Sequence, residues 1–426
     1  MNEIGGNQLK IHNILIENFR GISRTELHLE GKSSVLFGEN GTGKSSVLDC
    51  LAIMLSRVAA GVSNNRAGAG RRQFQESDIQ IGYKVSQSQL NVKYNNSFYT
   101  WSLSKNKDLR KTTIKKNNQL SMLVHNINEE LEANSKANIP LSVYYPVNRA
   151  VLDVPLRIRK KHFFDQISSY EGALTSGADF RVFFEWFRAQ EDLENEIRVR
   201  TTKNYIDPLL NAVRKAIYSF LPGFTDIQVS RYPLRMIIHK GNIPLEVNQL
   251  SQGEKCMLAM VGDLARRLAI ANPNLEEPLM GEGLVLIDEI ELHLHPSWQR
   301  KILDILTTTF PNLQFIVTTH SPQVLGETKK MNTYILKWNE NSISINKSES
   351  LYGRDTNRIL EDYMDSNSRD KVIDDKIKEL FKMITHKNLD KAVEIQNRLI
   401  EILGDEEPEL IKADVILKRW RKSNNE

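Results

Sequence analysis

Alternating apolar and polar residues dominate the N-terminal part of the chain, a pattern typical of half-buried β-strands. Residues 9–19 alternate in this way, residues 24–37 predict a hairpin that ends in a short apolar strand, and the alternation returns at 79–103. A glycine-rich turn and a helix at about 44–60 interrupt these strands. We therefore expect a small antiparallel sheet attached to a larger core.

The middle of the chain changes to helical periodicity from about residue 162 to 222. Apolar residues recur there at helical spacing, namely Phe180, Phe183, Phe184, Phe187, Leu193 and Ile197. An aromatic stripe of this kind belongs to a core far more often than to a ligand site. We therefore expect a helical insertion that packs against the rest of the protein.

Further along, short apolar strands alternate with helices. Strands are predicted at 284–288 and 314–318, helices at 253–271 and 297–309, and the chain after about 350 is almost entirely helical. Buried strands that alternate with helices indicate parallel pairing. The predicted fold class is α/β, a mixed sheet flanked by helices, with a helical insertion and a C-terminal helical extension.

Composition narrows the class of protein only a little. The 426 residues include 57 basic and 53 acidic side chains, and this net charge of +4 neither indicates nor excludes a nucleic-acid partner. Cys50 and Cys256 lie among apolar neighbours, which suits a reducing compartment. The N-terminus has no signal-peptide core, and no apolar run approaches the roughly 20 residues that span a bilayer. We expect a cytoplasmic protein with no membrane partner.

Residues 38–45, GENGTGKS, match the phosphate-loop pattern G-x-x-x-x-G-K-[ST], between an apolar strand and a helix. Glycines let backbone N–H groups close around phosphates, and the helix N-terminus adds partial positive charge. We expect Lys44 to reach the β- and γ-phosphates of ATP and the Ser45 hydroxyl to ligate Mg²⁺. A chance glycine turn is the alternative, and its context makes it a poor one. The candidate nucleotide-binding residues here are Gly38, Glu39, Asn40, Gly41, Thr42, Gly43, Lys44, Ser45 and Ser46.

Four apolar residues at 284–287 run directly into two acids, Asp288 and Glu289. This pattern predicts a buried strand whose end emerges at the ligand-binding edge of a sheet. We expect Asp288 to hold Mg²⁺ opposite Ser45, and Glu289 to orient or deprotonate the attacking water. A strand that simply ends in two solvated acids is the alternative, which the upstream phosphate loop disfavours.

Residues 315–321, FIVTTHS, form a second strand that ends in polar groups, among them His320. We expect this imidazole to hydrogen-bond the γ-phosphate or the attacking water, although a lone histidine after a strand is more often structural. His293 and His295 form an HxH pair that lacks the further ligands of a zinc site. We interpret this pair as part of a loop at a subunit contact.

Residues 250–255, LSQGEK, open a predicted helix. Ser251 is a good N-cap, and Gly253 would let the backbone approach an anion closely. In isolation the segment is no more than a capped helix. In order with GENGTGKSS, LVLIDE and TTHSP, however, it resembles the signature of ABC-type ATPases of the RecF and SMC class. The resemblance covers about 10–60 and 245–325.

That resemblance implies an ABC-ATPase head that works as a homodimer or higher homo-oligomer. Ser251, Gly253 and Glu254 of one subunit would complete the ATP site of the other, and hydrolysis would release the pair. The resemblance also implies a glutamine that contacts Mg²⁺ at the start of the insertion. Gln73 is our candidate, and Gln75 is the alternative.

The same resemblance divides the chain into four segments. They are the N-terminal part of the ATPase head (1–160), a helical insertion (161–225), the C-terminal part of the head (226–345) and a helical partner-binding extension (346–426). The insertion between phosphate loop and signature mixes strands with short helices, which excludes a long coiled-coil arm.

A finer resemblance rests on residues 144–149, YYPVNR, and on residues 351–355, LYGRD. Both are similar to segments of Septu ATPases (PtuA) and retron-associated ATPases of bacterial anti-phage systems. The resemblance implies a regulatory ATPase that controls a separate HNH nuclease subunit (PtuB-like). Nothing in this chain looks like a nuclease, so any DNA cleavage would come from that partner. The C-terminal helices would either dock this partner or simply pack on the core.

Two basic runs bear on DNA or retron nucleic acid as a further partner. One contains Arg157, Arg159, Lys160 and Lys161, and the other Lys105, Lys107, Lys111, Lys115 and Lys116. Such runs are usually solvated surface, but clustered on one rim they would follow a phosphate backbone. Two other functions stay open: a RecF-like repair ATPase that clamps DNA without a nuclease, and a nucleotide-sensing scaffold with negligible turnover, which Glu289 disfavours.

Overall fold

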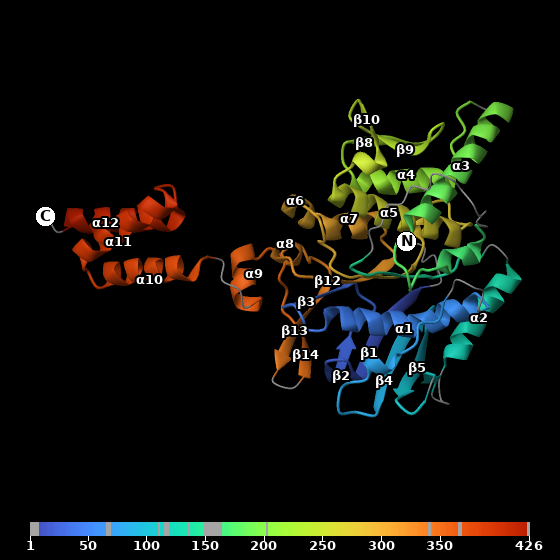
Figure 1. Cartoon of the computed structure of the whole chain (residues 1–426), viewed down its shortest axis with the longest axis horizontal. Helices are drawn as coiled ribbons and strands as arrows, with labels where there is room; N and C mark the ends of the chain where they lie inside the picture. The colour runs from blue at the N-terminus through green and yellow to red at the C-terminus, as the bar shows by residue number, and fades with distance from the viewer. Residues whose placement is uncertain are drawn as a thin grey trace. The chain divides into compact units, whose positions relative to one another are not determined.

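The computed structural model describes residues 8–64, 70–109, 111–114, 119–134, 137–148, 164–201, 203–339, 342–364 and 369–423. The chain divides into two compact units, Met1–Arg354 and Asp355–Glu426, and each is described by itself. Figure 1 labels their helices and strands. The segment boundary expected at 345/346 falls inside strand β14 (Ser342–Lys347), so the helical extension begins later than the sequence suggested.

A six-stranded sheet forms the centre of the first unit (Figure 1). All its neighbouring strands are parallel except β14, which is antiparallel to β13. β3, β7, β11 and β12 are buried along their whole lengths, which explains why their sequences are mostly apolar without alternation. The predicted α/β fold with a mixed sheet is confirmed. In spatial order the strands are β14, β13 (Asn332–Asn339), β3 (Ser34–Gly38), β12 (Leu313–Thr319), β11 (Gly283–Ile287) and β7 (Leu141–Tyr145).

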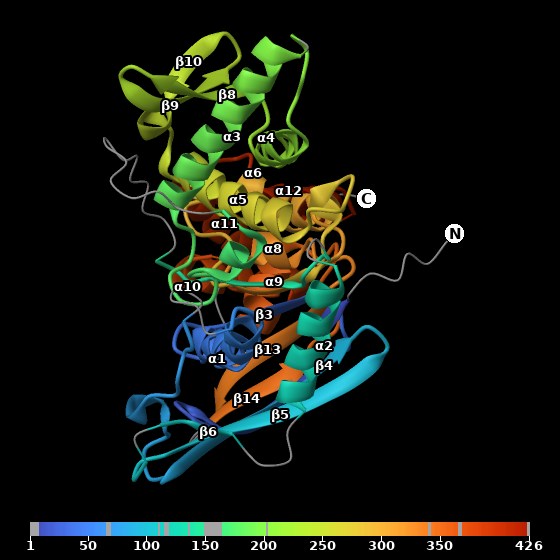
Figure 2. The ribbon, with the colours of Figure 1, turned by 90° about the vertical axis from the view of Figure 1, so that its right-hand side faces the viewer.

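A five-stranded antiparallel sheet accounts for the alternating N-terminal segments. Its buried face shares one core with helix α1 (Lys44–Val62), which also contacts the central sheet at β3, β11 and β12. Helix α2 (Leu120–Ala133) packs beside α1, as Figure 2 shows. In spatial order the strands are β2 (Ile22–His28), β1 (Leu9–Phe19), β4 (Val85–Tyr94), β5 (Ser97–Asn106) and β6 (Thr113–Ile114).

Helix α1 is long and apolar enough, by length and composition alone, to cross a membrane. The expectation that no segment approaches this limit was therefore wrong. However, 78% of its most apolar window is buried inside the protein, where the helix lies between two sheets. α1 is thus a core helix, and its apolar composition reflects that burial.

A helical layer covers the other side of the central sheet (Figure 1). Helix α5 (Gln252–Ala271) contacts β7 and packs against α3 (Phe180–Arg200) and α4 (Pro208–Phe220), and α4 contacts α7 (Ile302–Thr309). A three-stranded antiparallel sheet adjoins this layer. Its strands are β10 (Ile243–Glu246), β9 (Leu234–Lys240) and β8 (Phe224–Arg231), and the short helices α6 (Pro296–Gln299) and α8 (Pro322–Leu325) follow β11 and β12.

The aromatic stripe of α3 is buried as predicted, but its continuation is not. Leu193, expected on the same buried face, is 45% exposed. Glu191 and Glu194 are buried instead, and their carboxylates pair with Arg231 and Arg214. Ionic contacts with neighbouring elements therefore replace apolar packing in this part of the helix, which periodicity alone did not reveal. The buried aromatic residues are Phe180, Phe183, Phe184 and Phe187.

The second unit is helical, in agreement with the pattern after residue 350. Its helices are α9 (Thr356–Tyr363), α10 (Lys371–Thr385), α11 (Leu389–Leu403) and α12 (Pro408–Ser423). Helices α10, α11 and α12 contact one another around a buried cluster that includes Leu380, Leu399 and Leu410. The unit therefore has a hydrophobic core of its own.

Candidate functional site

The segment between β3 and α1 is a tight loop at the edge where the parallel strands end. Gly38 lies so close to β13 that a Cβ on it would stand 2.2 Å from the carbonyl oxygen of Leu336. Gly41 and Gly43 have φ values of +82° and +84°, in the left-handed region that glycine adopts without strain. The backbone path of the loop itself therefore requires these three glycines.

Lys44, the first residue of α1, folds back over this loop. Its Nζ donates to the carbonyl oxygens of Gly38 at 2.9 Å and Glu39 at 2.7 Å. Ser45 is exposed and Ser46 half-buried at the start of the same helix. The N-cap residue of α1 is Gly43, which has no side chain to cap the helix, so the first N–H groups and the partial positive charge of α1 can face an anion.

Asp288 and Glu289 follow β11 directly and emerge at the same edge of the sheet. Asp288 is buried and accepts a hydrogen bond from the Thr318 hydroxyl at 2.5 Å. The backbone N–H of Glu289 donates to the same Thr318 oxygen at 2.7 Å. Glu289 has a φ of +47°, which non-glycine residues rarely adopt. Thr318, near the end of β12, thus ties both acids to the neighbouring strand and supports this backbone conformation.

Negative charge surrounds the Lys44 ammonium. Burial lowers the pKa of Lys44 to about 8, although Asp288, Glu289, Glu291 and Glu39 all act to raise that pKa. Four carboxylates around one ammonium leave an excess of negative charge that a divalent cation would offset. Among the described residues, no group of three or more His, Cys, Asp or Glu forms a metal cage. Mg²⁺ needs none, because it binds through one or two protein oxygens and keeps waters and phosphates as its other ligands.

His320 follows β12 and lies beside Glu289, with 4.0 Å between Nε2 and Oε1. Burial lowers the pKa of His320 to about 4, and Lys44 contributes in the same direction. The imidazole is therefore neutral at physiological pH, and its contact with Glu289 is not an ion pair. The backbone N–H of His320 donates to Glu291 Oε1 at 2.5 Å. Burial raises the pKa of the Glu291 carboxyl. Glu291 thus fixes the position of the histidine backbone.

The segment that contains the two candidate glutamines is anchored to α1. An Arg72 guanidinium nitrogen lies 2.9 Å from Oδ1 of Asp49, which is in the second turn of α1. Gln73 is the next residue and is exposed. The Gln75 N–H donates to the Asp78 carboxylate at 2.8 Å, and the Gln75 side-chain amide donates to the Gln73 carbonyl at 3.4 Å. Gln73 and Gln75 are both exposed, so the choice of Gln73 as the metal-contacting residue stays a prediction.

Ser251 caps α5 in a reciprocal arrangement with Glu254. The Glu254 N–H donates to the Ser251 hydroxyl oxygen at 3.3 Å, and the Ser251 N–H donates to the Glu254 carboxylate at 2.8 Å. Ser251 is exposed, so this helix tip faces solvent. A Cβ on Gly253 would lie 2.5 Å from the carbonyl oxygen of His293. Packing against His293 therefore requires a glycine at this position. The sequence predicted a different reason for it, namely the close approach of the backbone to an anion.

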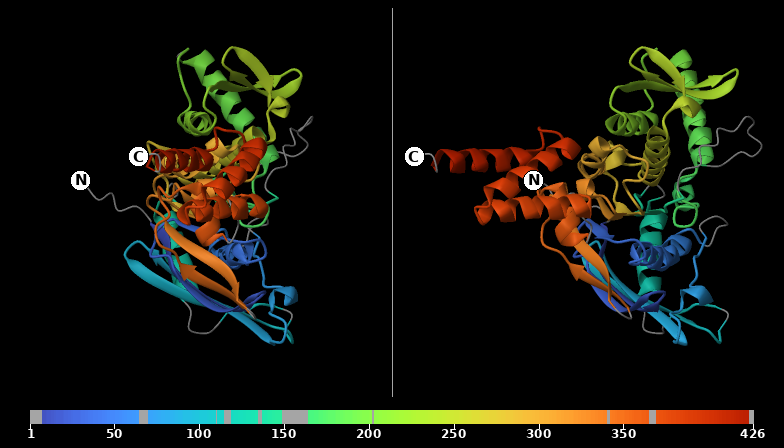
Figure 3. Two further views of the ribbon diagram at one scale, coloured as in Figure 1. Left: turned by 90° about the vertical axis from the view of Figure 1, so that its left-hand side faces the viewer. Right: turned by 60° about the vertical axis from the view of Figure 1, so that its left-hand side comes forward.

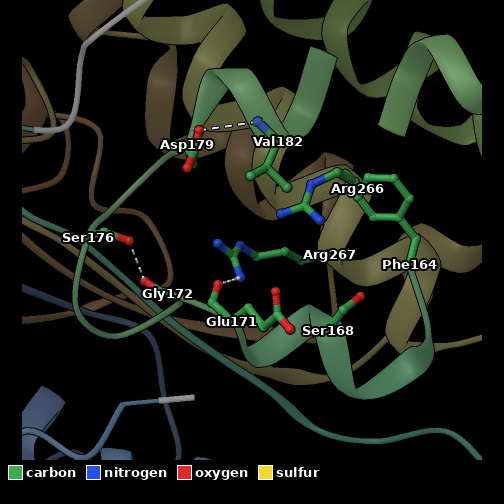
Figure 4. Close-up of a pocket in the computed structure, with 9 residues that line it drawn as sticks. All are labelled: Phe164, Ser168, Glu171, Gly172, Ser176, Asp179, Val182, Arg266 and Arg267. Carbon is green, nitrogen blue, oxygen red and sulfur yellow. Dashed lines mark hydrogen bonds between the residues drawn. The ribbon is translucent and has the colours of Figure 1, made fainter. Parts of the chain in front are cut away.

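A buried ionic cluster braces the strand beside the acids. The Tyr145 hydroxyl donates to the Asp263 carboxylate at 2.9 Å, and Arg266 and Arg267 each pair with that carboxylate at 2.7 Å. Burial opposes the charge of Asp263, but the two guanidiniums outweigh it and hold the pKa of Asp263 below its usual value. Both arginines line a cavity of about 190 Å³ (Figure 4). The N–H of Asp288 donates to the carbonyl of Tyr145 at 2.9 Å, which connects the cluster to the acids.

Sequence reasoning did not single out Thr318, Glu291 and Asp49. Each lies close to a motif, because Thr318 precedes His320 by two positions and Glu291 follows Glu289 by two. This closeness to a motif was the signal in the sequence that could have identified these residues. Their partners, however, lie on other elements, so only the folded chain reveals what these side chains contact.

Much of the expected nucleic-acid surface lies outside the described residues, namely Arg157, Arg159, Lys160, Lys161, Lys115 and Lys116. Lys105 is only 5% exposed, and its ammonium donates to the Leu109 carbonyl. Including it in a DNA-binding run was therefore wrong. Lys107 and Lys111 are exposed and remain candidates for contact with nucleic acid.

Comparison with known proteins agrees with this geometry. A family model described as "AAA domain, putative AbiEii toxin, Type IV TA system" matches residues 33–326, more than half of the chain. The chain is 33% identical over 404 residues to "Retron Ec83 probable ATPase" of Escherichia coli, covering 79% of this chain and 73% of that protein. It is 32% identical over 380 residues to "Retron Vc95 probable ATPase" of Vibrio cholerae serotype O1 biovar El Tor, covering 76% and 72%.

A more distant relative and a solved structure extend the comparison. Septu protein PtuA of Bacillus thuringiensis is 23% identical over 428 residues, which cover 96% of this chain and 98% of that protein. An SMC head, solved bound to the C-winged helix domain of ScpA, covers 80% of this chain and 98% of its own, with a TM-score of 0.50 and 14% identity. The chain therefore belongs to this AAA-domain family, is an ATPase related to the retron ATPases and to Septu PtuA, and has a fold similar to that of an SMC head.

Proposed function

We propose that two copies of this chain enclose MgATP between them, and that ATP hydrolysis controls a separate nuclease in an anti-phage defence system. The main support for the proposal is that several charged and polar side chains meet at one edge of the central sheet. There the Lys44 ammonium lies among Asp288, Glu289 and Glu291, with the neutral His320 beside Glu289. This set supplies a phosphate contact, a metal contact and a water-positioning group within one charged cluster.

The roles follow from the surroundings of each side chain. Lys44 exchanges its two backbone carbonyl partners for phosphate oxygens. Ser45, Asp288 and Gln73 hold Mg²⁺, which when bound neutralises phosphate charge. Glu289 accepts a proton from, or orients, the attacking water. A neutral His320 has one ring nitrogen to donate and one to accept, so it can hydrogen-bond the γ-phosphate or that water.

The second subunit contributes the exposed tip of α5. The Ser251 hydroxyl accepts from the Glu254 N–H, which leaves its own proton for an acceptor outside the chain. We assign that acceptor as the γ-phosphate bound by the partner copy. ATP then joins the two subunits, and hydrolysis separates them. A cytoplasmic location is part of this proposal.

The second unit is the proposed docking site for the nuclease, an HNH subunit (PtuB-like). Several apolar side chains on its helices are exposed despite the buried core that the same helices share. On α12, Ile411 is 49% and Val415 is 44% exposed, and they lie one turn apart on the same face. An apolar partner surface would cover them. The kinship with Septu PtuA and retron ATPases supports a nuclease as that partner.

Replacing Glu289 with Gln tests the enzymatic core of the proposal. Glutamine keeps the size of the side chain but cannot take a proton, so phosphate release should fall about 10²- to 10⁴-fold. ATP affinity should stay near that of the wild type. Size-exclusion chromatography with ATP and Mg²⁺ should show the variant as an ATP-dependent dimer that does not dissociate.

Lys44→Ala is the matched control and should show neither ATP binding nor a dimer. A Glu289→Gln protein that hydrolyses ATP at the wild-type rate, or that stays in the nucleotide-free assembly state, would contradict the proposal.

A further inference from the structure

The order of strands sets the direction in which a nucleotide crosses the loop. β12 and β11, which lead to His320, Asp288 and Glu289, lie on one side of β3, and β13 and β14 lie on the other. If the γ-phosphate faces the acids, the nucleoside end of ATP must leave the loop toward β13 and β14. The side chains of that hairpin are therefore the ones that the base would meet.

The hairpin extends past the start of the phosphate loop. Leu336 is in register with Gly38, so the residues after Leu336 run beyond the end of β3. Trp338 pairs with Ile343 across the hairpin, which places both side chains on the same face. Figure 3 shows this hairpin beside the blue N-terminal strands, and β14 contacts β2.

That face of the hairpin is turned toward the opening of the loop. The Ile343 side chain comes within 2.7 Å of where a Cβ on Gly43 would stand, and within 2.8 Å of the same position on Gly21. The Trp338 ring approaches the Gly21 position to 3.0 Å. The Ile343 N–H donates to the Gly21 carbonyl at 3.2 Å, which fixes the hairpin at this place.

Trp338 nevertheless remains 57% exposed. Its edge is held against the β1–β2 turn at Gly21, and a large part of the indole surface faces solvent. Ile343, its partner across the hairpin, is the side chain that lies beside Gly43 at the start of α1. An aromatic ring held in this way needs little further ordering to accept a flat partner. A purine or pyrimidine base has such a flat π-face, whereas the phosphate chain does not.

We propose that Trp338 is the platform on which the base of bound ATP stacks. The proposal rests on the proposed function, because it requires the phosphates to occupy the loop at Lys44. Stacking recognises any base by its face. Trp338 thus strengthens nucleotide binding without choosing adenine over guanine, and GTP should bind by the same contact.

The test compares two ligands that share phosphates and differ in the base. Binding of ATP and of inorganic tripolyphosphate, each with Mg²⁺, is measured on the full-length chain. Loss of an aromatic stacking contact weakens binding by roughly 5- to 150-fold. For a partly solvated ring we expect Trp338→Ala to bind ATP on the order of tenfold more weakly. Its affinity for tripolyphosphate should be unchanged.

A second variant separates stacking from a structural role. Trp338→Phe keeps a ring and should retain ATP affinity within about threefold. It should lose the ATP-dependent quenching of tryptophan fluorescence that we expect in the wild type. The control is Phe98→Ala, which removes a 53% exposed ring from β5 and should change neither affinity.

Two results would overturn the proposal: unchanged ATP affinity in Trp338→Ala, or an equal loss of ATP and tripolyphosphate affinity. Failure of the proposed function looks different. In that case the wild type binds neither ligand, or Lys44→Ala binds both as well as the wild type does.

Discussion

Lys44 shows how strongly one side chain depends on its surroundings. Its ammonium is partly removed from water, and the carboxylates of Asp288 and Glu289 only partly offset that cost, so its pKa falls to about 8. The charge that a phosphate would meet is therefore sensitive to mildly alkaline pH. The charge of His320, in contrast, does not change near pH 7, because its pKa of about 4 keeps the imidazole uncharged there.

The Lys44 shift predicts a loss of ATP affinity above pH 8. The ammonium loses its proton as pH rises through about 8, so the nucleotide-free protein offers less positive charge to the phosphates. Between pH 7.5 and 9.5 we expect ATP affinity to fall on the order of tenfold. Isothermal titration calorimetry at fixed ionic strength measures this. Lys44→Arg is the control, since its guanidinium stays charged and its affinity, although weaker, should not follow pH.

The titration of Lys44 does not itself destabilise the folded protein at alkaline pH. The unfolded lysine keeps its proton up to its ordinary pKa of 10.5, while the folded one releases it near 8. The unfolded state thus binds more protons over this interval, and the contribution of Lys44 to the free energy of unfolding rises with pH. Wild-type affinity that is flat from pH 7.5 to 9.5 would show that Lys44 does not titrate in this range.

Among the helices and strands, α12 has two apolar faces, one buried and one exposed. On α12, Leu410, Ala413 and Leu417 are buried in the core of the second unit. Ile411 and Val415 lie on a separate, exposed face. A helix with two apolar faces is costly to leave in water, which is why we assign the exposed one to a partner.

Placing acids on that face should remove the partner without affecting the ATPase. In an Ile411→Glu and Val415→Glu double variant, the HNH subunit should no longer copurify when the two proteins are coexpressed. ATP hydrolysis should stay within about twofold, because surface substitutions away from a packed core change stability little. Lys412→Glu on the same helix is the control and should copurify normally. If the HNH subunit still copurifies with the double variant, its docking site is not this face of α12.

Contacts between helices and strands also hold the two acids in place. The pairing of Asp263 with Arg266, Arg267 and Tyr145 connects α5 to β7, and β7 supports the backbone of Asp288. Ser251 is the N-cap of helix α5, so one helix joins the cluster beneath the acids to the tip offered to the other subunit. We interpret α5 as the physical link between the two halves of the ATP site.

At the scale of the whole molecule, the proposal requires that each ATP site combine two chains. Lys44 and Ser251 then belong to different subunits at any one site, and C2 symmetry produces two such sites. Two inactive variants should therefore complement each other when mixed. This behaviour cannot arise if each chain hydrolyses ATP alone.

We expect Lys44→Ala and Ser251→Arg proteins each to lack ATP hydrolysis. In an equal mixture only a mixed dimer contains an intact site, because one of its two sites combines an unaltered Lys44 with an unaltered Ser251. Activity should then recover to at most about half of the wild-type level, measured as phosphate release. A mixture as inactive as its separate components would argue against the shared site.

The phosphate loop, the acids after β11 and the histidine after β12 can be located from the amino-acid sequence alone. These features are local, because a glycine loop before a helix and polar residues after a buried apolar strand are fixed by backbone geometry and burial over a few residues. The alternating segments at 9–19 and 79–103 likewise predicted strands of the antiparallel sheet, and the apolar strands predicted the parallel one. The hairpin expected at 24–37 was wrong, because β2 joins the antiparallel sheet and β3 joins the central one. Such patterns depend only on neighbours along the chain.

Which distant groups meet depends instead on the folded arrangement of the chain. The contact of Thr318 with Asp288, the burial of Lys105, the exposure of Leu193 and the position of Trp338 beside Gly21 all depend on elements far apart in sequence. No local pattern encodes these contacts, because each arises from how a sheet orders its strands and which face another element covers. The sequence therefore identified the chemical groups of the site, and the fold determined their partners and their charge.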